Sequence, residues 1–239
     1  MLDYDGTLAP FRVERERALP PPRVMPLVRA IAESSRTRLA LVTGRPLDQL
    51  EGLIGSLNAS LVGEHGWEEQ TSDHGRVRFP LPEGAEVDLA RAAEAAAARG
   101  WEARLERKRA SVVFHTRGMA RDVAADLEAT ATQLWEHASE RLRLVRIAGG
   151  LELRVIGRDK GTAVRGLTER SAHGTLPVYV GDDVTDEDAF GAVREWGLGI
   201  RVGSDERPTL ARGRLVSCEA VADFLATWLR SVERRERIP

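Results

Sequence analysis

Aspartates cluster near both ends of this 239-residue chain. Asp3 and Asp5 stand in Asp-Tyr-Asp-Gly-Thr, and a second cluster starts at Asp182 in Gly-Asp-Asp-Val-Thr-Asp-Glu. In an extended segment, residues two apart point to the same side, with Cα atoms about 7 Å apart. One carboxylate can then attack a phosphorus atom while the other protonates the leaving oxygen and later activates water. The spacing predicts Asp3 as a nucleophile and Asp5 as the acid/base.

The second cluster predicts a divalent cation among these carboxylates. Mg²⁺ prefers oxygen ligands in octahedral geometry, and we expect them from Asp3, Asp182 and the main-chain carbonyl of Asp5. Asp183 and Asp186 are expected to act through water or by orienting the loop. A calcium EF-hand does not fit, because the required ligand residues and the glycine at the sixth position do not follow Asp182, Asp183 or Asp186.

Two other segments offer groups that suit a phosphate. Thr43, Gly44 and Arg45 follow an apolar run and supply a hydroxyl, a close-approach glycine and a cation. Lys160 stands at the start of a predicted helix, where its ammonium could neutralise both the phosphoryl oxygens and the attacking carboxylate. Of the chain's 35 basic residues only Lys108 and Lys160 are lysines. A site shaped for an ammonium does not accept a guanidinium, so both are candidates for specific roles.

The elements that carry these groups follow from the apolar pattern. Short apolar runs that end in glycine and polar residues predict buried parallel strands, and amphipathic stretches between them predict helices. The predicted strands cover residues 39–43, 61–62, 178–180 and 199–202, and the helices cover 23–34, 47–57, 161–169 and 186–195. This alternation predicts an α/β fold with a parallel sheet, and ligands bind at the carboxyl ends of such strands.

The middle of the chain has a different order of elements. A helix over 87–99 is followed by a strand pair, a second helix over 120–137 and another strand pair. The expected strands cover residues 101–105, 111–116, 142–147 and 151–156. The order predicts a small antiparallel sheet with two helices. We therefore expect an inserted α+β domain at 81–158 within a catalytic core made of 1–80 and 159–239.

The motifs together resemble the haloacid dehalogenase-like (HAD) phosphatase superfamily. They are Asp-x-Asp-Gly-Thr, Thr-Gly-Arg, Lys-Gly and Gly-Asp-Asp-x-Thr-Asp-Glu, in that order. The insert lies where that superfamily has its type C2 cap. The resemblance covers the whole chain and implies a Rossmann-like core, Mg²⁺ as cofactor, Asp3 as nucleophile, Asp5 as acid/base and Asp182 as a metal ligand.

Longer motifs resemble trehalose-6-phosphate phosphatases within that superfamily. These are Asp-Tyr-Asp-Gly-Thr-Leu-Ala-Pro, Gly-Glu-His-Gly, Glu-x-Lys followed by His-x-Arg, and Gly-Asp-Asp-x-Thr-Asp-Glu-x-x-Phe. The resemblance implies hydrolysis of trehalose 6-phosphate through an aspartyl-phosphate, as a step of trehalose biosynthesis. It places sugar contacts at Glu106, Lys108, Arg117 and Glu152. Substrate contacts are also expected on the core loops, at Gly44, Arg45, Glu64, His65 and Gly66.

Several alternatives stay open at this point. The substrate could be another sugar phosphate, such as sucrose phosphate or mannosyl-3-phosphoglycerate. A non-catalytic phospho-acceptor domain also combines acids, a threonine and a lysine, but in another chain order and without an insert. A non-catalytic sugar-phosphate-binding relative is disfavoured by the intact Asp3 and Asp5.

The composition limits the partners and the cell compartment that we expect for this protein. The 35 basic and 37 acidic residues nearly balance, so nothing suggests a nucleic-acid or membrane surface. The single cysteine, Cys218, fits a reducing compartment. We expect a cytoplasmic monomer that acts on a small-molecule sugar phosphate and pairs functionally with a trehalose-6-phosphate synthase. Only Met1 and Leu2 precede Asp3, whereas strands usually have about five residues, so we expect the first strand to begin upstream.

Overall fold

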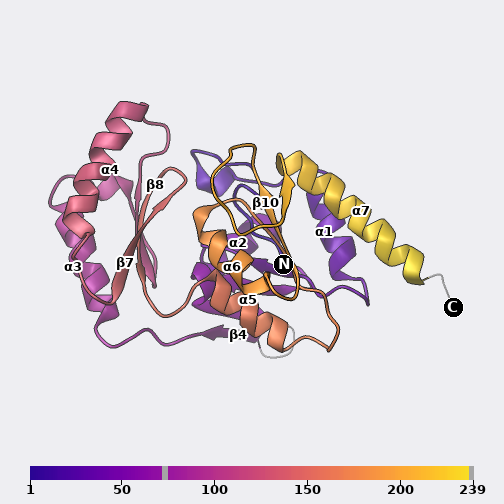
Figure 1. Cartoon of the computed structure of the whole chain (residues 1–239). Helices are drawn as coiled ribbons and strands as arrows, with labels where there is room; N and C mark the ends of the chain where they lie inside the picture. The colour runs from indigo at the N-terminus through magenta and orange to yellow at the C-terminus, as the bar shows by residue number, and fades with distance from the viewer. Residues whose placement is uncertain (72–74, 237–239) are drawn as a thin grey trace. The chain divides into compact units, whose positions relative to one another are not determined.

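The chain leaves one folded unit at Arg78 and returns to it at Asp159, as the computed structural model shows (Figure 1). Unit 1 comprises Met1–Arg78 and Asp159–Pro239, and unit 2 comprises Phe79–Arg158. The structure describes residues 1–71 and 75–236. Each unit has its own sheet and helices and is described by itself.

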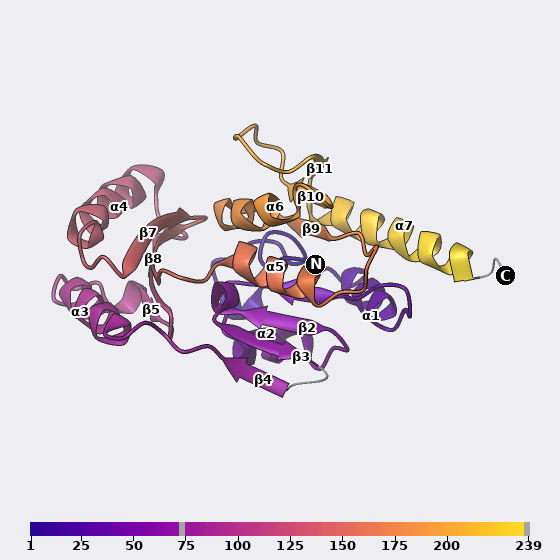
Figure 2. The same cartoon turned by 60° about the horizontal axis from the view of Figure 1, so that its bottom comes forward.

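A mostly parallel sheet crosses unit 1. Leu2 forms parallel bridges to Leu41 and Val180, and so joins the strands β4-β3-β2-β1 on one side to β9-β10-β11 on the other. The outer strands β3 and β4 run antiparallel to their neighbours (Figure 2). The strands are β1 (Ala40–Val42), β2 (Ser60–Gly63), β3 (Glu68–Thr71), β4 (Gly75–Arg78), β9 (Val178–Gly181), β10 (Leu198–Val202) and β11 (Gly213–Leu215).

Both faces of this sheet are buried. Successive side chains of a strand point to opposite faces, and accordingly Val180 and Tyr179 belong to two different apolar clusters. The first cluster includes Leu2 and the second includes Phe190. Because helices cover both faces, the strands consist of continuous apolar runs rather than alternating ones.

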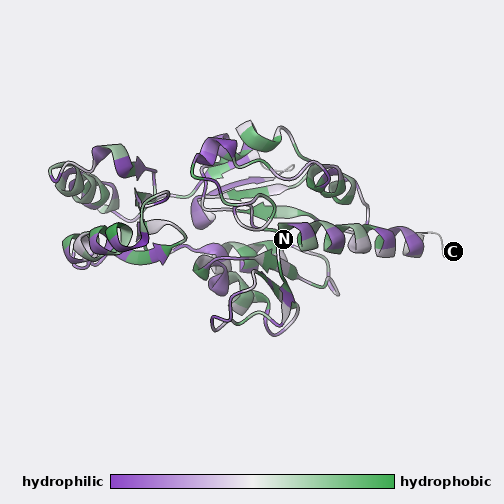
Figure 3. Ribbon diagram, turned by 90° about the horizontal axis from the view of Figure 1, so that it is seen from above, coloured by the Kyte–Doolittle hydropathy of each residue, from purple (hydrophilic) through white to green (hydrophobic). Residues whose placement is uncertain are grey.

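The helices of unit 1 pack in pairs. Helix α1 contacts α7, and α5 lies beside α6 (Figure 2). In α1, Val24, Val28 and Ile31 recur at helical spacing and are buried. Figure 3 shows hydrophobic and hydrophilic residues alternating along α7, as expected for a helix with one apolar face. The helices are α1 (Val24–Ala32), α2 (Leu47–Ile54), α5 (Lys160–Glu169), α6 (Glu187–Val193) and α7 (Cys218–Glu236). Within the described residues, no helix is long and apolar enough to cross a membrane.

Unit 2 is an antiparallel sheet in the order β5-β6-β8-β7, packed against two helices. Phe114 lies edge-on to Trp135, with ring centroids 6.5 Å apart. Trp135 donates to the carbonyl of Ala92 at 3.0 Å and so ties the two helices together. The elements are α3 (Ala85–Ala97), β5 (Leu105–Arg107), β6 (Ser111–His115), α4 (Arg121–Trp135), β7 (Leu142–Ile147) and β8 (Gly150–Val155).

The predicted fold class is confirmed: a parallel α/β sheet is combined with a small antiparallel sheet and two helices. The predicted strand over 101–105 is wrong. A 3-10 turn occupies Glu102–Arg104, and the strand begins only at Leu105. Trp101 has φ of −95° and ψ of 8°, which is not strand geometry, and its ring lies 4.9 Å from that of Phe114. The β3–β4 hairpin was not predicted.

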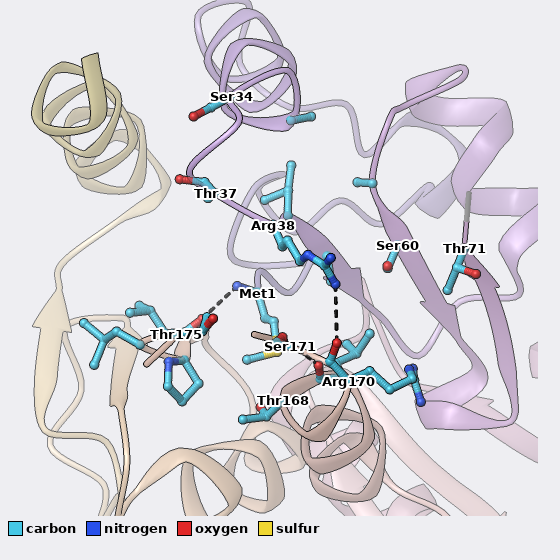
Figure 4. Close-up of a pocket in the computed structure, with 18 of the residues that line it drawn as sticks. Met1, Ser34, Thr37, Arg38, Ser60, Thr71, Thr168, Arg170, Ser171 and Thr175 are labelled. Atoms are coloured by element: carbon cyan, nitrogen blue, oxygen red, sulfur yellow. Dashed lines mark hydrogen bonds between the residues drawn. The ribbon is translucent and has the colours of Figure 1, made fainter. Parts of the chain in front are cut away.

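A cavity of about 630 Å³ lies at the amino ends of β1 and β9 (Figure 4). Its wall includes Met1, whose amine donates to the carbonyl of Val178 at 2.7 Å. Arg38 donates to the carbonyl of Arg170 across the same cavity at 3.4 Å. Met1 and Leu2, which lead to Asp3, are therefore both bonded to β9.

Replacing Leu2 with alanine should destabilise the protein strongly. Leu2 is 3% exposed and lies between the two halves of the sheet, and Leu→Ala changes in cores cost about 2–5 kcal/mol. Urea unfolding measures the change. Leu19→Ala, at a position that is 55% exposed, is the control and should change the free energy of unfolding by about 0.5 kcal/mol or less. Equal effects of the two variants would contradict the central position of Leu2.

Candidate active site

Three strand ends bring polar side chains to one edge of the unit 1 sheet. Asp3 follows Leu2, Thr43 follows β1, and Asp182 follows β9. The amide of Asp3 donates to the carbonyl of Val180 at 2.9 Å, which fixes Asp3 beside the end of β9. Carboxylate oxygens of Asp3, Asp182 and Asp186 lie within 4.8 Å of one another. These parallel strands thus gather residues from both ends of the chain.

Lys160 lies between two of these carboxylates. Its Nζ donates to Oδ1 of Asp3 and to Oδ1 of Asp186, both at 2.7 Å, and the residue is 3% exposed. The carboxylate of Asp159 caps helix α5 by accepting from the amide of Thr162 at 2.6 Å, so the helix start holds Lys160 in place. Burial disfavours the ammonium, but Asp186 and Asp3 outweigh it and raise the pKa of Lys160.

Burial and the neighbouring carboxylates raise the pKa of Asp3, the nucleophile candidate. Burial is the main cause that lifts the pKa of Asp3 to about 7, and the neighbouring Asp186 and Asp5 add to it against the effect of Lys160. Burial likewise raises the pKa of Asp182 well above its usual range, with Asp3 and Asp186 contributing. One ammonium does not balance these carboxylates. The donor set, buried oxygens with excess negative charge, therefore fits a hard divalent cation.

Glycine at position 6 is required by the approach of Asp182. Gly6 has φ of 83°, and a Cβ there would lie 2.1 Å from Oδ2 of Asp182. The next residue, Thr7, donates from its hydroxyl to Oδ1 of Asp182 at 3.3 Å. The turn after Asp5 thus touches the second acidic cluster directly, and any side chain at Gly6 would push that cluster away.

Asp186 accepts from four donors and orders its own loop. Its Oδ1 accepts from Lys160 at 2.7 Å and from the hydroxyl of Tyr179 at 2.6 Å. Its Oδ2 accepts from the amides of Asp182 and Asp183 at 2.9 and 2.8 Å. Asp183 in turn accepts from the amide of Val184 at 2.8 Å. The lone pairs of Asp186 are engaged inside the protein, which suits an orienting role better than direct metal binding.

Arg45 pairs with Asp5. Its Nε and Nη2 donate to the two oxygens of Asp5, each at 2.6 Å, and it is 1% exposed. Nη2 also donates to the carbonyl of Arg15 at 3.0 Å. The substrate role of Arg45 stays a prediction, and in this structure its guanidinium orients the Asp5 carboxylate. Such two-bond pairs fix the plane of a carboxylate.

The Glu64–Gly66 segment packs directly on the Thr43–Arg45 loop. Glu64 donates from its amide to the carbonyl of Arg45 at 2.9 Å, and His65 does the same to Thr43 at 3.0 Å. Glu64 and His65 have φ of 45° and 56°, a left-handed conformation that costs a non-glycine residue about 1–3 kcal/mol. Gly44 lets the His65 ring approach, since a Cβ there would lie 2.5 Å from Nε2.

The expected sugar contacts lie together in unit 2. Glu106 and Glu152 are both in register with Val113, so their side chains share one face of the sheet. Phe114, next to Val113, packs on α4, so this is the face away from the helices. Nζ of Lys108 lies 3.1 Å from Oε1 of Glu152.

Two further contacts involve the side chains of Glu152 and Glu106. The hydroxyl of Ser111 donates to the same oxygen of Glu152 at 2.7 Å, and Nε2 of His115 lies 2.9 Å from Oε2 of Glu106. Arg117 lies beyond β6 and donates to the carbonyl of Ala148 at 3.3 Å. Three of the four expected residues thus share one polar cluster, while Arg117 lies on the following turn.

Three residues of the unit 1 site were not predicted from the sequence. Tyr179 bonds Asp186, Thr7 bonds Asp182, and Arg207 donates to the main-chain carbonyl of Asp182. Tyr179 looks like an ordinary residue of a buried strand, and Arg207 is one arginine among many. Only Thr7 carried a signal, because it is the last residue of the first acidic motif.

The fold and this set of residues define a haloacid dehalogenase-like phosphatase. A Candida albicans trehalose-6-phosphate phosphatase domain superposes with a TM-score of 0.83 at 20% identity, covering 96% of this chain and 90% of that one. A trehalose-6-phosphate phosphatase related protein gives 0.75 at 25% identity, covering 98% of each. The family model described as trehalose-phosphatase matches residues 1–216. The chain belongs to the trehalose-phosphatase family.

The chain covers very different shares of the relatives that its sequence matches. A probable trehalose-phosphate phosphatase of Sinorhizobium fredii is 32% identical, over 94% of this chain and 85% of its own length. The Escherichia coli trehalose-6-phosphate phosphatase is 28% identical, over 93% and 83%. An uncharacterized glycosyl hydrolase of Mycobacterium tuberculosis is 35% identical over 94% of this chain, which spans only 18% of that protein's length.

Replacing Lys160 with methionine should destabilise the protein most at high pH. The variant leaves Asp3 and Asp186 without their buried cation, a loss of about 3–5 kcal/mol when both are ionised. A carboxyl whose pKa is raised takes up a proton as the pH falls, so the loss should shrink from pH 8 to pH 5. Urea unfolding in EDTA at both pH values measures it. Arg165→Met, an exposed position on the same helix, should show little loss at either pH.

Proposed function

We propose that this chain is a Mg²⁺-dependent phosphatase that hydrolyses trehalose 6-phosphate to trehalose and phosphate. The observation that carries the proposal is the buried Lys160 bonded to Asp3 beside Asp182, in a chain that the trehalose-phosphatase model matches over 1–216. Relatives named trehalose-phosphate phosphatase in two bacteria support the substrate. The substrate would come from an enzyme that makes trehalose 6-phosphate, such as the synthase expected above.

The proposed reaction has two steps at one phosphorus atom. A carboxylate oxygen of Asp3 forms a bond to phosphorus, the bond from phosphorus to the sugar oxygen breaks, and Asp5 gives that oxygen its proton. Water then attacks the phosphorus of the aspartyl-phosphate, Asp5 takes the water's proton, and Asp3 is released with phosphate. Arg45 fixes the orientation of the Asp5 carboxylate by two hydrogen bonds, and this pairing favours the ionised form that takes the water's proton in the second step.

Other residues of unit 1 stabilise charge during these steps. Lys160 and the hydroxyl and amides around Thr43 would bind the phosphoryl oxygens, which gain negative charge as the ester bond breaks. Asp3, Asp182 and the main-chain carbonyl of Asp5 would hold Mg²⁺, with Asp183 and Asp186 orienting the loop. The cation, when bound, supplies positive charge that offsets the repulsion between Asp3 and an anionic phosphate.

Unit 2 is proposed to select the sugar. In this division, residues 1–80 and 159–239 form the catalytic core and residues 81–158 form the cap. Glu106, Lys108 and Glu152 offer charged donors and acceptors on the sheet face that the helices leave uncovered, and polar groups of this kind suit sugar hydroxyls. Arg117 and the Glu64–Gly66 loop complete the proposed substrate contacts.

Phosphate release from a substrate panel tests the function. Trehalose 6-phosphate, sucrose 6-phosphate, mannosyl-3-phosphoglycerate and an aryl phosphate are compared with and without Mg²⁺. We expect trehalose 6-phosphate to have the highest kcat/KM by at least about tenfold, which equals about 1.4 kcal/mol of transition-state preference. A preference for another sugar phosphate would support the phosphatase activity but exclude trehalose 6-phosphate as the substrate. Phosphate release without Mg²⁺ would exclude Mg²⁺ as a required cofactor.

Asp3→Asn should lower turnover by more than about 10³-fold, since an amide cannot form the acyl phosphate. The change is nearly isosteric, and loss of the raised-pKa carboxyl should not lower the melting temperature. Turnover of purified protein is measured on trehalose 6-phosphate. Asp223→Asn, at a surface ion pair with Arg23, is the control and should keep the wild-type rate. Substantial residual turnover in Asp3→Asn would exclude Asp3 as nucleophile.

Mg²⁺ should raise the melting temperature, and the rise should grow with pH between 5 and 8. The pKa of Asp3 is about 7 without metal, so below that pH protons compete with the cation for the same oxygens. Differential scanning fluorimetry in EDTA and in excess Mg²⁺ measures the difference. In Asp182→Asn, Mg²⁺ should no longer raise the melting temperature. An equal rise in melting temperature at pH 5 and pH 8 would contradict the assignment of these carboxylates as the Mg²⁺ site.

Lys108→Ala should lower kcat/KM for trehalose 6-phosphate by about 10–100-fold, the usual worth of a charged hydrogen bond to a substrate. Turnover of an aryl phosphate, which has no sugar hydroxyls, should stay within about threefold. Arg107→Ala, the neighbouring position on β5 with a surface pairing to Glu102, is the matched control. Equal losses on both substrates would remove Lys108 from the sugar site.

A further inference from the structure

Tyr179 has no part in the motifs that point to the phosphatase chemistry, yet its hydroxyl reaches the centre of the unit 1 site. It donates to Oδ1 of Asp186 at 2.6 Å, the same oxygen that accepts from Nζ of Lys160 at 2.7 Å. Lys160 in turn donates to Oδ1 of Asp3 at 2.7 Å. A continuous series of hydrogen bonds therefore runs from Tyr179 through Asp186 and Lys160 to the proposed nucleophile.

Packing fixes the position of the Tyr179 hydroxyl. The residue is fully buried in the second apolar cluster of unit 1, among side chains of β1, β2, α5 and α6. Its ring meets Phe190 edge-on, with centroids 5.7 Å apart and planes at 76°. A ring held on β9 by this cluster cannot follow a moving partner, so its hydroxyl is a fixed donor.

Asp186 has little freedom of its own. Its carboxylate lies directly on the main chain of Gly181, where a Cβ would be 2.4 Å from Cγ. Its other oxygen accepts from the amides of Asp182 and Asp183. Tyr179 supplies the fourth donor, on the side of the carboxylate that faces Lys160.

The donor from Tyr179 decides how Asp186 shares Lys160 with Asp3. Without it, Oδ1 of Asp186 has a lone pair open to the ammonium alone, and a buried acceptor left short of donors draws the nearest cation closer. Nζ would then move toward Asp186 and away from Asp3. We propose that Tyr179 is a positioning residue whose hydroxyl holds the shared oxygen of Asp186 and thereby sets Lys160 against Asp3. Its effect on rate rests on the phosphatase function proposed above.

Tyr179→Phe tests the kinetic part of the proposal, since it removes only the hydroxyl. We expect kcat to fall about 10-fold or more while KM changes less than about twofold, equally on trehalose 6-phosphate and an aryl phosphate, because the series ends at the phosphoryl group. The control is Tyr4→Phe, which removes the other buried tyrosine hydroxyl, bonded to the carbonyl of Ala18. It should keep kcat within about twofold.

A double-mutant cycle asks whether Tyr179 acts through Asp186. In an Asp186→Asn background, Tyr179→Phe should change kcat by less than about twofold, because the intermediate link is already altered. Additive losses, or a kcat of Tyr179→Phe within twofold of wild type, would overturn the proposal.

The two lysines of the chain allow a readout that needs no turnover. Lysine labelled with ¹⁵N gives side-chain signals from Lys108 and Lys160 alone. In Tyr179→Phe the Lys160 signal should shift, and the Lys108 signal, from unit 2, should not. An unmoved Lys160 signal would overturn the proposal whatever the kinetics. A wild-type protein that cleaves no phosphate ester would overturn the function instead, and the Lys160 signal would still decide the positioning.

Discussion

The buried ammonium of Lys160 is the interaction on which the unit 1 site depends. It donates to Asp3 and Asp186 at equal distances, and the residue is 3% exposed. Burying a carboxylate without a partner is costly, and two of them at this edge would repel each other. The ammonium, at the start of a helix that Asp159 caps, offsets this cost and lets the two carboxylates lie close together. The excess negative charge that remains at Asp182 fits a divalent cation.

Glycines and two residues in left-handed conformations let the loops of the unit 1 site come together around Lys160. Gly6 lets Asp182 come close, and Gly181 admits the Asp186 carboxylate. Glu64 and His65 keep left-handed conformations because the amides of both bond the Thr43–Arg45 loop. Residues that would be awkward elsewhere are thus concentrated where two loops must touch, as is common where function limits the choice of backbone.

The sequence was informative where spacing alone constrains geometry. Parallel strand ends meet at one edge, so Asp3, Thr43 and Asp182 could be expected together from the pattern of apolar runs. The partner of Arg45 could not, because a long guanidinium side chain reaches either a phosphate or Asp5 from the same backbone position. Tyr179 was hidden because a buried tyrosine in a strand is ordinary, and its importance lies in one hydrogen bond across to the next loop. The strand expected from Trp101 begins only at Leu105, since strand propensity depends on context and a 3-10 turn occupies Glu102–Arg104.

The discontinuity of unit 1 has a consequence for how the protein is made. Leu41, one neighbour of Leu2, follows it closely in the sequence, but the other neighbour, Val180, is synthesised only after the whole of unit 2. Lys160 and Asp186 also arrive late. An unfinished chain therefore carries Asp3 on a half-paired segment with no ammonium beside it. The hydrogen-bonded surroundings of Asp3 are therefore complete only when the sheet is complete, after the whole of unit 2 has been synthesised.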